Sequence, residues 1–348
     1  MADQQQPATN NDSSSILSPP RPARKAFRKW IGDEMGGMID WGQHALFRGA
    51  SRICRSTPDV VHDALRSVLR DATFYALGRI RQVCYGNLTI VRGEVWDADE
   101  IRRFTRNVFD FWGKVVLDFL RLRHVIDDRN WKQFVRVEHL QHLEDALASP
   151  GGTIVAGPHM GNWELIGQSL AWMDVPVTSI ARRRKHSSGI DRELMDWRTR
   201  WGQGVVYSEE SPRKLMRLLK DGEVLGIVAD QYSGREGIFT DFFGAQTAHY
   251  PGVAVFANRM EVPVVPVHCY RERDGTYVVE FDQPIDPVTD GDQDACNRNL
   301  IAQLFRRFES YIRRHPYQWL WFHRKWRDKW LRDEHIDMLK RAPYLTNH

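Results

Sequence analysis

Short apolar runs alternate with helical segments along the second half of the chain, and this pattern constrains the fold more than any other feature. Runs of strand length lie at 153–156, 175–180, 205–207, 224–229, 262–270 and 276–281. Segments with helical character separate or follow these runs, at 162–172, 191–201, 213–220, 251–259 and 294–314. Strands that are separated by helices indicate a mainly parallel sheet. We therefore predict one α/β domain whose sheet is flanked by helices.

Helices are also predicted ahead of this domain. Apolar residues recur at steps of three and four, which is typical of an amphipathic helix: Ile101, Phe104, Val108, Phe111, Val115, Phe119 and Leu122. Asp97 is the expected N-cap, and Glu100 completes a capping box. The stripe favours core packing over a ligand site. We expect a disordered tail at 1–25, a helical extension at 26–150, and the α/β core with a tryptophan-rich end at 151–340.

Composition excludes several other kinds of protein. Of the 348 residues, 42% are hydrophobic and 27% are charged, which excludes a wholly disordered chain. The formal net charge of +4 is too small to argue for nucleic acid. The run at 242–258, which has no Asp, Glu, Lys or Arg, contains Pro251 and makes a poor membrane span. No secretory signal peptide is expected, and the four cysteines lie too far apart to indicate a disulfide or zinc framework.

The sharpest candidate for a functional site is the sequence GPHMGNWE at 157–164. It follows a predicted strand and opens a helix, and ligand sites in α/β folds cluster at the carboxyl ends of strands. If the turn brings Glu164 to one imidazole nitrogen of His159, the other nitrogen becomes more basic. His159 can then take a proton from a hydroxyl. The alternative is a core or capping histidine beside an exposed glutamate; the strand-end position favours the functional interpretation.

Other chemistries lack their motifs in this sequence. There is no G-x-S-x-G elbow for a hydrolase nucleophile, and no H-E-x-x-H or other close cluster of zinc ligands. Nucleotide binding is unsupported, because neither G-x-x-x-x-G-K-[ST] nor a strand-linked G-x-G-x-x-G is present. We therefore expect no metal and no cofactor. Without a protein nucleophile, His159 and Glu164 suit direct transfer to an external hydroxyl.

Polar residues also follow two further predicted strands. Four consecutive cations, Arg182 to Lys185, follow the run at 175–180 and can hold phosphates or stabilise an oxyanion. The alternative for these cations is a solvated basic loop. Asp230 and Gln231 follow the run at 224–229, and an aspartate at a strand end can position a cation or a substrate hydroxyl. Alone, this last signal is weak.

Two segments combine cations with aromatic residues. Residues 21–30 carry five cations and no acid, and residues 319–330 carry four tryptophans. Both compositions fit an anionic membrane surface, where each cation adds about 1 kcal/mol, although the first segment can also be a solvated tail. The second composition can stack bases, but the motif at His159 does not fit nucleic-acid chemistry, so no nucleic-acid partner is expected. Trp319 and Trp321 are expected in the core, and membrane contacts are expected from Arg24, Lys25, Phe27, Trp30, Trp326 and Trp330.

Together these residues resemble the lipid A biosynthesis acyltransferase family, the late lauroyl and myristoyl acyltransferases of Gram-negative bacteria. The resemblance covers about residues 40–332. It rests on HMGNWE at 159–164, the strand that ends at Arg182, the pair Asp230–Gln231, and FFG at 242–244 with Thr247. The most specific piece is PYQWLWFHRKW at 316–326, which fits the pattern Q-[WY]-x-W-x-H-R-[RK]. Several motifs in the right order argue against chance.

The resemblance implies a single acyltransferase domain that transfers a fatty acyl chain from a thioester to a lipid hydroxyl. It implies acyl carrier protein as the usual donor, with acyl-CoA as the alternative, and a membrane glycolipid such as a lipid A precursor as the acceptor. His159 and Glu164 are implied as the catalytic pair. Substrate contacts are expected from Asn162, Arg182, Arg183, Asp230, Gln231 and Thr247.

Two departures from the family pattern bear on this interpretation. Family members usually begin with a membrane helix, and this sequence predicts none, so we expect peripheral attachment at the cytoplasmic face of the inner membrane. The Asn-Pro that usually follows the family arginine is replaced by KHSS at 185–188, so a lipid A precursor, a glycolipid and an aminolipid all stay open as acceptors. A catalytically silent, membrane-associated lipid-binding protein is the alternative from another class; the intact pair of His159 and Glu164 argues against it.

Overall fold

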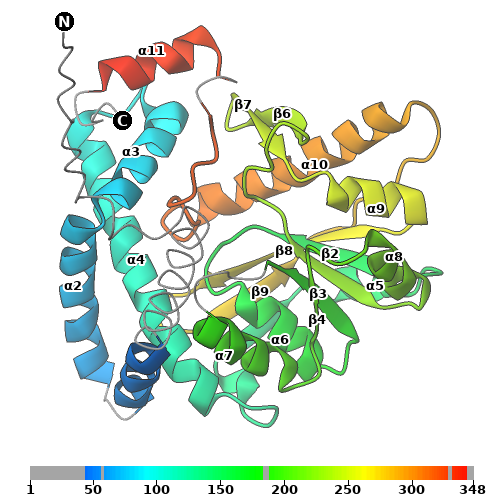
Figure 1. Ribbon diagram of the computed structural model, residues 1–348, viewed down its shortest axis with the longest axis horizontal. Coiled ribbons are helices and arrows are strands. Elements are labelled where there is room, and N and C mark those ends of the chain that lie inside the picture. Colours follow the sequence, from blue (N-terminus) through cyan, green and yellow to red (C-terminus); the bar gives the residue numbers. More distant parts are fainter. Residues whose placement is uncertain (1–43, 56–58, 183–187, 328–330, 343–348) are drawn as a thin grey trace, which may run out of the picture.

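The computed structural model describes residues 44–55, 59–182, 188–327 and 331–342 (Figure 1). A helix over 44–55 is followed by α2 (Asp59–Ala76), α3 (Gly78–Arg92), α4 (Ala98–Val125), α5 (Gln141–Leu147), α6 (Glu164–Trp172), α7 (Ser188–Thr199), α8 (Pro212–Lys220), α9 (Gly252–Met260), α10 (Gln293–Arg314) and α11 (Asp333–Arg341). Figure 1 shows α2, α3 and α4 together at the left of the view, with α8 and α9 at the right, beyond the main sheet. No helix within the described ranges is both long enough and apolar enough to cross a membrane.

The main sheet has seven strands in the order β1-β9-β8-β2-β5-β3-β4. They are β1 (Val135–Glu138), β2 (Thr153–Gly157), β3 (Val177–Ala181), β4 (Gly204–Tyr207), β5 (Val224–Val228), β8 (Val264–Arg271) and β9 (Tyr277–Phe281). Five neighbouring strands, from β8 to β4, run parallel, whereas β9 runs antiparallel to β8 and β1 parallel to β9. The register pairs Gly157 with Val228 at the ends of β2 and β5. The segments that follow these two strands therefore emerge side by side.

Each face of the sheet is buried in its own core, because side chains alternate between the two faces along a strand. Ile154 and Ala156 of β2 lie in one core with apolar residues of α8, α9 and α10. Val155 lies in the other core with apolar residues of α5 and α6. Burial on both faces explains why the parallel strands are nearly continuous apolar runs. It confirms the prediction of a mainly parallel α/β fold.

The helices α3 and α4 share the first of these cores with the segment after α10. Trp112 of α4 donates its indole N–H to the Trp319 carbonyl at 3.2 Å. Asn87 of α3 donates to the carbonyls of Trp321 and His323, each at 2.8 Å. The predicted capping box at the start of α4 is present. The predicted helical extension thus packs directly against the tryptophan-rich segment.

Some elements were not expected from the sequence. The short β1 belongs to the main sheet, although it lies in the region predicted as a helical extension. β6 (Ile238–Phe242) and β7 (Ala245–His249) form a separate antiparallel hairpin. Its two turn residues, Phe243 and Gly244, have φ of 54° and 78°, the left-handed backbone that a tight hairpin turn needs. A phenylalanine at such a position is uncommon, so the residues of this turn did not predict a hairpin.

Candidate active site

His159 lies in the turn that joins β2 to α6. Gly161 of this turn has a φ of +56°, and a β-carbon there would lie 2.3 Å from the carbonyl oxygen of Cys269. Glycine is needed for both reasons, because it alone tolerates that backbone and that approach. The turn is therefore pressed against the end of β8, at the carboxyl edge of the sheet.

The side chain of His159 is paired with Asp230. Imidazole Nδ1 lies 2.5 Å from Oδ1 of Asp230, and the backbone N–H of His159 donates to Oδ2 at 2.9 Å. With its Nδ1 proton donated to the carboxylate, the neutral imidazole keeps the Nε2 lone pair as a proton acceptor. The imidazole side chain is 17% exposed, whereas that of Asp230 is 3% exposed. The histidine is thus the member of the pair that a substrate can reach.

Trp319 gives Asp230 a further hydrogen bond, from its indole Nε1 to Oδ2 at 2.6 Å. Burial alone would raise the pKa of Asp230. The charge and hydrogen bonds of His159, together with the bond from Trp319, outweigh burial and hold the pKa below its usual value. Asp230 therefore stays ionised near neutral pH. It can balance the positive charge that His159 gains on taking up a proton.

Glu164 has a different partner from the one that the sequence predicted. Its carboxylate accepts two hydrogen bonds from Arg198 of α7, from Nε at 2.7 Å and from Nη2 at 2.5 Å. This bidentate ion pair joins the start of α6 to α7. The position that Glu164 was expected to take at the imidazole belongs to Asp230, because β5 is the direct neighbour of β2.

The structure separates the other residues that were predicted to bind substrate. Arg182 is exposed at the end of β3. This strand lies two places from β2, or roughly 10 Å at the usual strand spacing. Asn162 and Thr247 are buried, at 3% and 1% exposure, and the Thr247 hydroxyl donates to the Lys325 carbonyl at 2.7 Å. Arg183 lies outside the described residues. Arg182 thus lies exposed at the same carboxyl edge of the sheet as His159.

The tryptophan-rich segment runs alongside the turn that carries His159. The N–H of Gly161 donates to the carbonyl of Gln318 at 3.0 Å, and the N–H of Leu320 donates to the carbonyl of His159 at 2.9 Å. Met160 and Trp319 form an antiparallel bridge between these bonds. The segment therefore supports the backbone of the turn as well as the carboxylate. Trp319 and its neighbour Trp321 are each 2% exposed, which confirms their predicted place in the core.

Residues of the same segment hold three consecutive positions of the loop after β5. Asp230 accepts the Trp319 bond described above. The next position, Gln231, offers its carbonyl to the Lys325 ammonium at 3.4 Å, and the N–H of Tyr232 donates to Nε2 of His323 at 3.1 Å. The sequence analysis recognised the motif at 316–326 but did not predict these hydrogen bonds. The spacing of residues within the motif does not indicate which loop it contacts.

Lys325 is fully buried, yet its ammonium has a complete set of acceptors. Besides the carbonyl of Gln231, it donates to the carbonyl of Ala248 at 3.3 Å and contacts Nδ1 of His249 at 3.2 Å. Burial lowers the pKa of Lys325 to about 7, and the charge of Asp230 acts in the opposite direction. Three acceptors match the three donors of an ammonium group. Lys325 thus ties the loop after β5 to β7.

One predicted membrane contact is wrong. Trp326 is 1% exposed, donates its indole N–H to the Ala245 carbonyl at 3.2 Å, and stacks on Phe242 with ring centroids 5.8 Å apart. The chain after Trp321 packs against the β6–β7 hairpin, which the sequence did not predict. The other predicted contacts lie outside the described residues: Arg24, Lys25, Phe27, Trp30 and Trp330.

The fold and the site together define a class of protein. A histidine with a free ring nitrogen, paired to a buried carboxylate at the carboxyl edge of an α/β sheet, is suited to general-base chemistry on a substrate hydroxyl. In the part of the chain that the structure describes, no group of three or more His, Cys, Asp or Glu side chains is arranged to hold a metal ion.

The chain belongs to the bacterial lipid A biosynthesis acyltransferase family, whose model matches residues 39–328. The resemblance drawn from the sequence motifs is thereby confirmed. The matched range includes the turn that carries His159, the loop after β5 and nearly all of the tryptophan-rich segment.

Individual relatives and one solved structure are also similar. A phosphatidylinositol mannoside acyltransferase of Mycobacterium tuberculosis (strain CDC 1551 / Oshkosh) is 30% identical over 191 residues, which cover 54% of this chain and 58% of that protein. The lipid A biosynthesis lauroyltransferase of Escherichia coli (strain K12) is 26% identical over 211 residues, or 58% and 65%. The match thus spans less than two thirds of either relative. The crystal structure of a 1-acyl-sn-glycerophosphate acyltransferase from Thermotoga maritima matches with a TM-score of 0.33 at 16% identity, covering 70% of this chain and 97% of that one.

Proposed function

We propose that this protein transfers a fatty acyl group from an acyl thioester to a hydroxyl of a membrane glycolipid. The observation that carries the proposal is the accessible imidazole of His159 paired with the buried carboxylate of Asp230, in a chain of the lipid A acyltransferase family. The acceptors named for relatives, lipid A and a phosphatidylinositol mannoside, suggest a glycolipid.

The reaction needs two proton transfers, one to His159 and one from it. Nε2 of His159 takes the proton of the acceptor hydroxyl while the oxygen attacks the thioester carbonyl. Asp230 stabilises the imidazolium that forms. When the tetrahedral intermediate collapses, the carbon–sulfur bond breaks and the imidazolium returns the proton to the thiolate leaving group. The thioester is reactive enough for this step to proceed without a covalent acyl-enzyme.

Glu164 and Arg182 have separate roles in this proposal. Glu164 acts through Arg198, fixing the start of α6 and so the orientation of the turn that carries His159. Arg182, exposed at the same edge, binds a substrate phosphate or the developing oxyanion. Neither role requires direct contact with the imidazole.

The donor is acyl carrier protein or acyl-CoA, and the protein works peripherally at the cytoplasmic face of the inner membrane. Acyl carrier protein is the first choice, because a lipid A enzyme is among the relatives. The acceptor is a lipid, so catalysis requires contact with a membrane surface.

The test is an acyl-transfer assay with purified protein, a detergent-dispersed glycolipid acceptor, and acyl carrier protein or acyl-CoA as separate donors. The proposal predicts transfer from at least one donor, and a loss of about 10²–10⁴-fold in rate in His159→Ala. Circular dichroism should show that the variant is folded. Binding of lipid without transfer from either donor would instead support a catalytically silent lipid-binding protein.

A further inference from the structure

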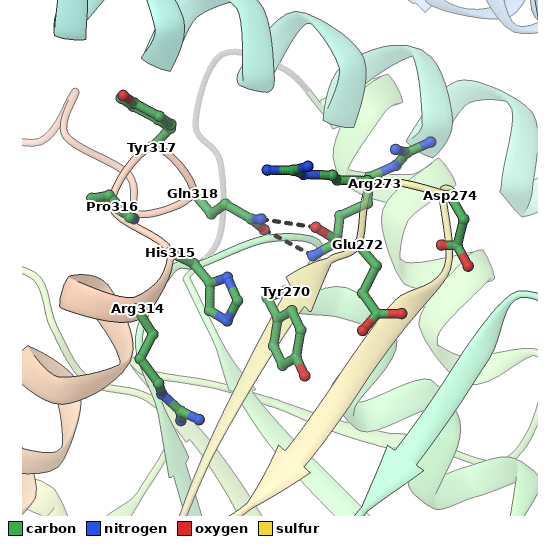
Figure 2. A pocket seen from close by; sticks show the side chains of 10 residues that line it. Tyr270, Glu272, Arg273, Asp274, Arg314, His315, Pro316, Tyr317 and Gln318 are labelled. Carbon is green, nitrogen blue, oxygen red and sulfur yellow. Dashed lines mark hydrogen bonds between the residues drawn. The ribbon is translucent and has the colours of Figure 1, made fainter.

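A cleft of about 810 Å³ lies beside the catalytic turn, on the side of β8 (Figure 2). One wall is the end of β8 with the turn after it, Tyr270 to Asp274, and the other is the end of α10 with the segment after it, Arg314 to Gln318. This volume falls in the range of small-molecule sites. The roles proposed for His159 and Asp230 leave the cleft without a function.

Gln318 fastens the cleft to the catalytic turn. Its side chain accepts the N–H of Arg271 at 2.8 Å and donates to the carbonyl of the same residue at 2.9 Å, which joins the two walls (Figure 2). Its own carbonyl accepts the N–H of Gly161, two residues after His159. A substrate whose reacting group lies at His159 can therefore place a group several bonds away in the cleft.

Stacked rings support the cleft from below. Tyr270 and His315 stack with centroids 4.1 Å apart, and Figure 2 shows the two rings facing each other between the walls. The stack continues inward from Tyr270 to His268 at 5.5 Å and on to Tyr311 at 4.0 Å. Burial, with the charge of the neighbouring Arg314, lowers the pKa of both histidines and keeps them neutral. The floor is thus uncharged and preorganised.

Among the described residues that line the cleft, one arginine has no ion pair. Arg271 donates to a carboxylate of α4 at 2.8 Å, and Arg314 donates to one of β9 at 3.0 Å. Glu272 accepts from Arg136 at 2.9 Å. Arg273, between these paired groups, is exposed and has no ion pair or side-chain hydrogen bond within the described residues. The neighbouring carboxylate of Asp274 accepts the backbone N–H of Thr276 within its own turn.

We propose that this cleft binds a phosphate ester of a substrate, with Arg273 as the cation that pairs with it. A guanidinium matches phosphate with two parallel hydrogen bonds, and the neutral ring floor supports the group that the phosphate carries. The inference rests on the proposed function, because both substrate classes bring such an ester. In the donor it is the phosphopantetheine arm, and in the acceptor it is a phosphorylated head group.

Two probe pairs distinguish the sources: 4′-phosphopantetheine against pantetheine, and a phosphorylated glycolipid in detergent against its dephosphorylated form. Binding to the full-length protein is measured by titration calorimetry for wild type, Arg273→Ala and Arg273→Lys. Arg298→Ala is the matched control, because Arg298 is an exposed arginine of α10 away from the cleft. Michaelis constants for donor and acceptor are measured in parallel.

We expect Arg273→Ala to weaken binding of one phosphorylated probe roughly tenfold or more, without weakening its unphosphorylated partner. The affected pair identifies the source, and its Michaelis constant should rise likewise. Arg273→Lys, which keeps the charge but loses the fork, should fall between. The proposal is overturned if wild type does not prefer either phosphorylated probe, or if Arg273→Ala affects both members of each pair equally or matches Arg298→Ala. If a phosphorylated probe binds as expected but no acyl transfer is found, the proposed function is refuted and the phosphate site in the cleft is still supported.

Discussion

Replacing Trp319 by phenylalanine removes one hydrogen bond from Asp230 and keeps most of the aromatic surface. The indole N–H donates to Oδ2 at 2.6 Å, and the carboxylate is only 3% exposed, so water has little access to replace the lost donor. A hydrogen bond to a charged group contributes about 1.5–3 kcal/mol, and the smaller ring adds roughly 1–2 kcal/mol of lost packing. We therefore expect the free energy of unfolding to fall by about 2.5–5 kcal/mol.

Trp326→Phe is the matched control for this change. Trp326 is equally buried and makes an equivalent indole bond at 3.2 Å, but its acceptor is the neutral carbonyl of Ala245. A neutral hydrogen bond contributes only about 0.5–1.5 kcal/mol, so Trp326→Phe should cost about 1–2 kcal/mol less than Trp319→Phe. The difference isolates the charge of Asp230.

Urea unfolding and acyl-transfer kinetics of both variants make the comparison. Trp319→Phe should also lower kcat/KM roughly 10–100-fold, because a carboxylate that has lost one donor no longer holds His159 in place. Trp326→Phe should change kcat/KM much less. Equal losses of unfolding free energy in the two variants, or an unchanged kcat/KM in Trp319→Phe, would refute the reasoning.

Acid should weaken the fold through His323, whose pKa burial lowers to about 4. Between that value and the ordinary value of about 6.5, the unfolded chain binds a proton that the native protein does not. The unfolding free energy then falls as pH falls, by up to about 1.4 kcal/mol per pH unit, and urea unfolding of His323→Gln should show a shallower fall than wild type; equal slopes would contradict this. Gly161→Ala should lower both the melting temperature and kcat/KM, because its β-carbon has no room beside Cys269; wild-type values for both would contradict the close approach. A double-mutant cycle of Glu164→Gln and Arg198→Met should give a coupling of about 1–3 kcal/mol in urea unfolding, whereas coupling near zero would mean that the ion pair is not formed in solution.

Local signals were sufficient for much of the fold. The apolar runs that became β2, β5 and β8 are continuous because both faces of the sheet are covered by helices. The capping box at Asp97 and Glu100 predicted the start of α4 from four residues of sequence. Elements with short or unusual signals were missed, namely β1, with four residues, and the hairpin whose turn places Phe243 at positive φ.

The candidate site was only partly predictable, because its central pair spans the sheet. Sequence reasoning placed His159 and Asp230 each at the end of a strand. It could not tell that β2 and β5 are neighbours, since strand order depends on long-range packing that no local pattern records. Glu164, five residues from the histidine, was therefore predicted as its partner. The structure instead pairs Glu164 with Arg198 on the next helix.

The tryptophan-rich segment shows the same limit. Its pattern identified the family. The hydrogen bonds between Trp319, Lys325 and His323 and three consecutive loop residues, however, depend on how the chain returns to the sheet. The misplaced membrane role of Trp326 has the same cause. A segment with a tryptophan among cations has the same composition whether the tryptophan faces lipid or packs on a hairpin.

The measurement that tests the central claim most directly is kcat/KM for acyl transfer in Asp230→Asn and Glu164→Gln, beside His159→Ala and wild type. Both amide variants keep the shape of the side chain, and circular dichroism confirms that each is folded. The His159–Asp230 pair predicts that Asp230→Asn approaches the loss in His159→Ala, about 10²–10⁴-fold, and that Glu164→Gln loses at least about tenfold less. An Asp230→Asn variant near wild type, with Glu164→Gln as impaired as His159→Ala, would contradict the pair and return the partner's role to Glu164.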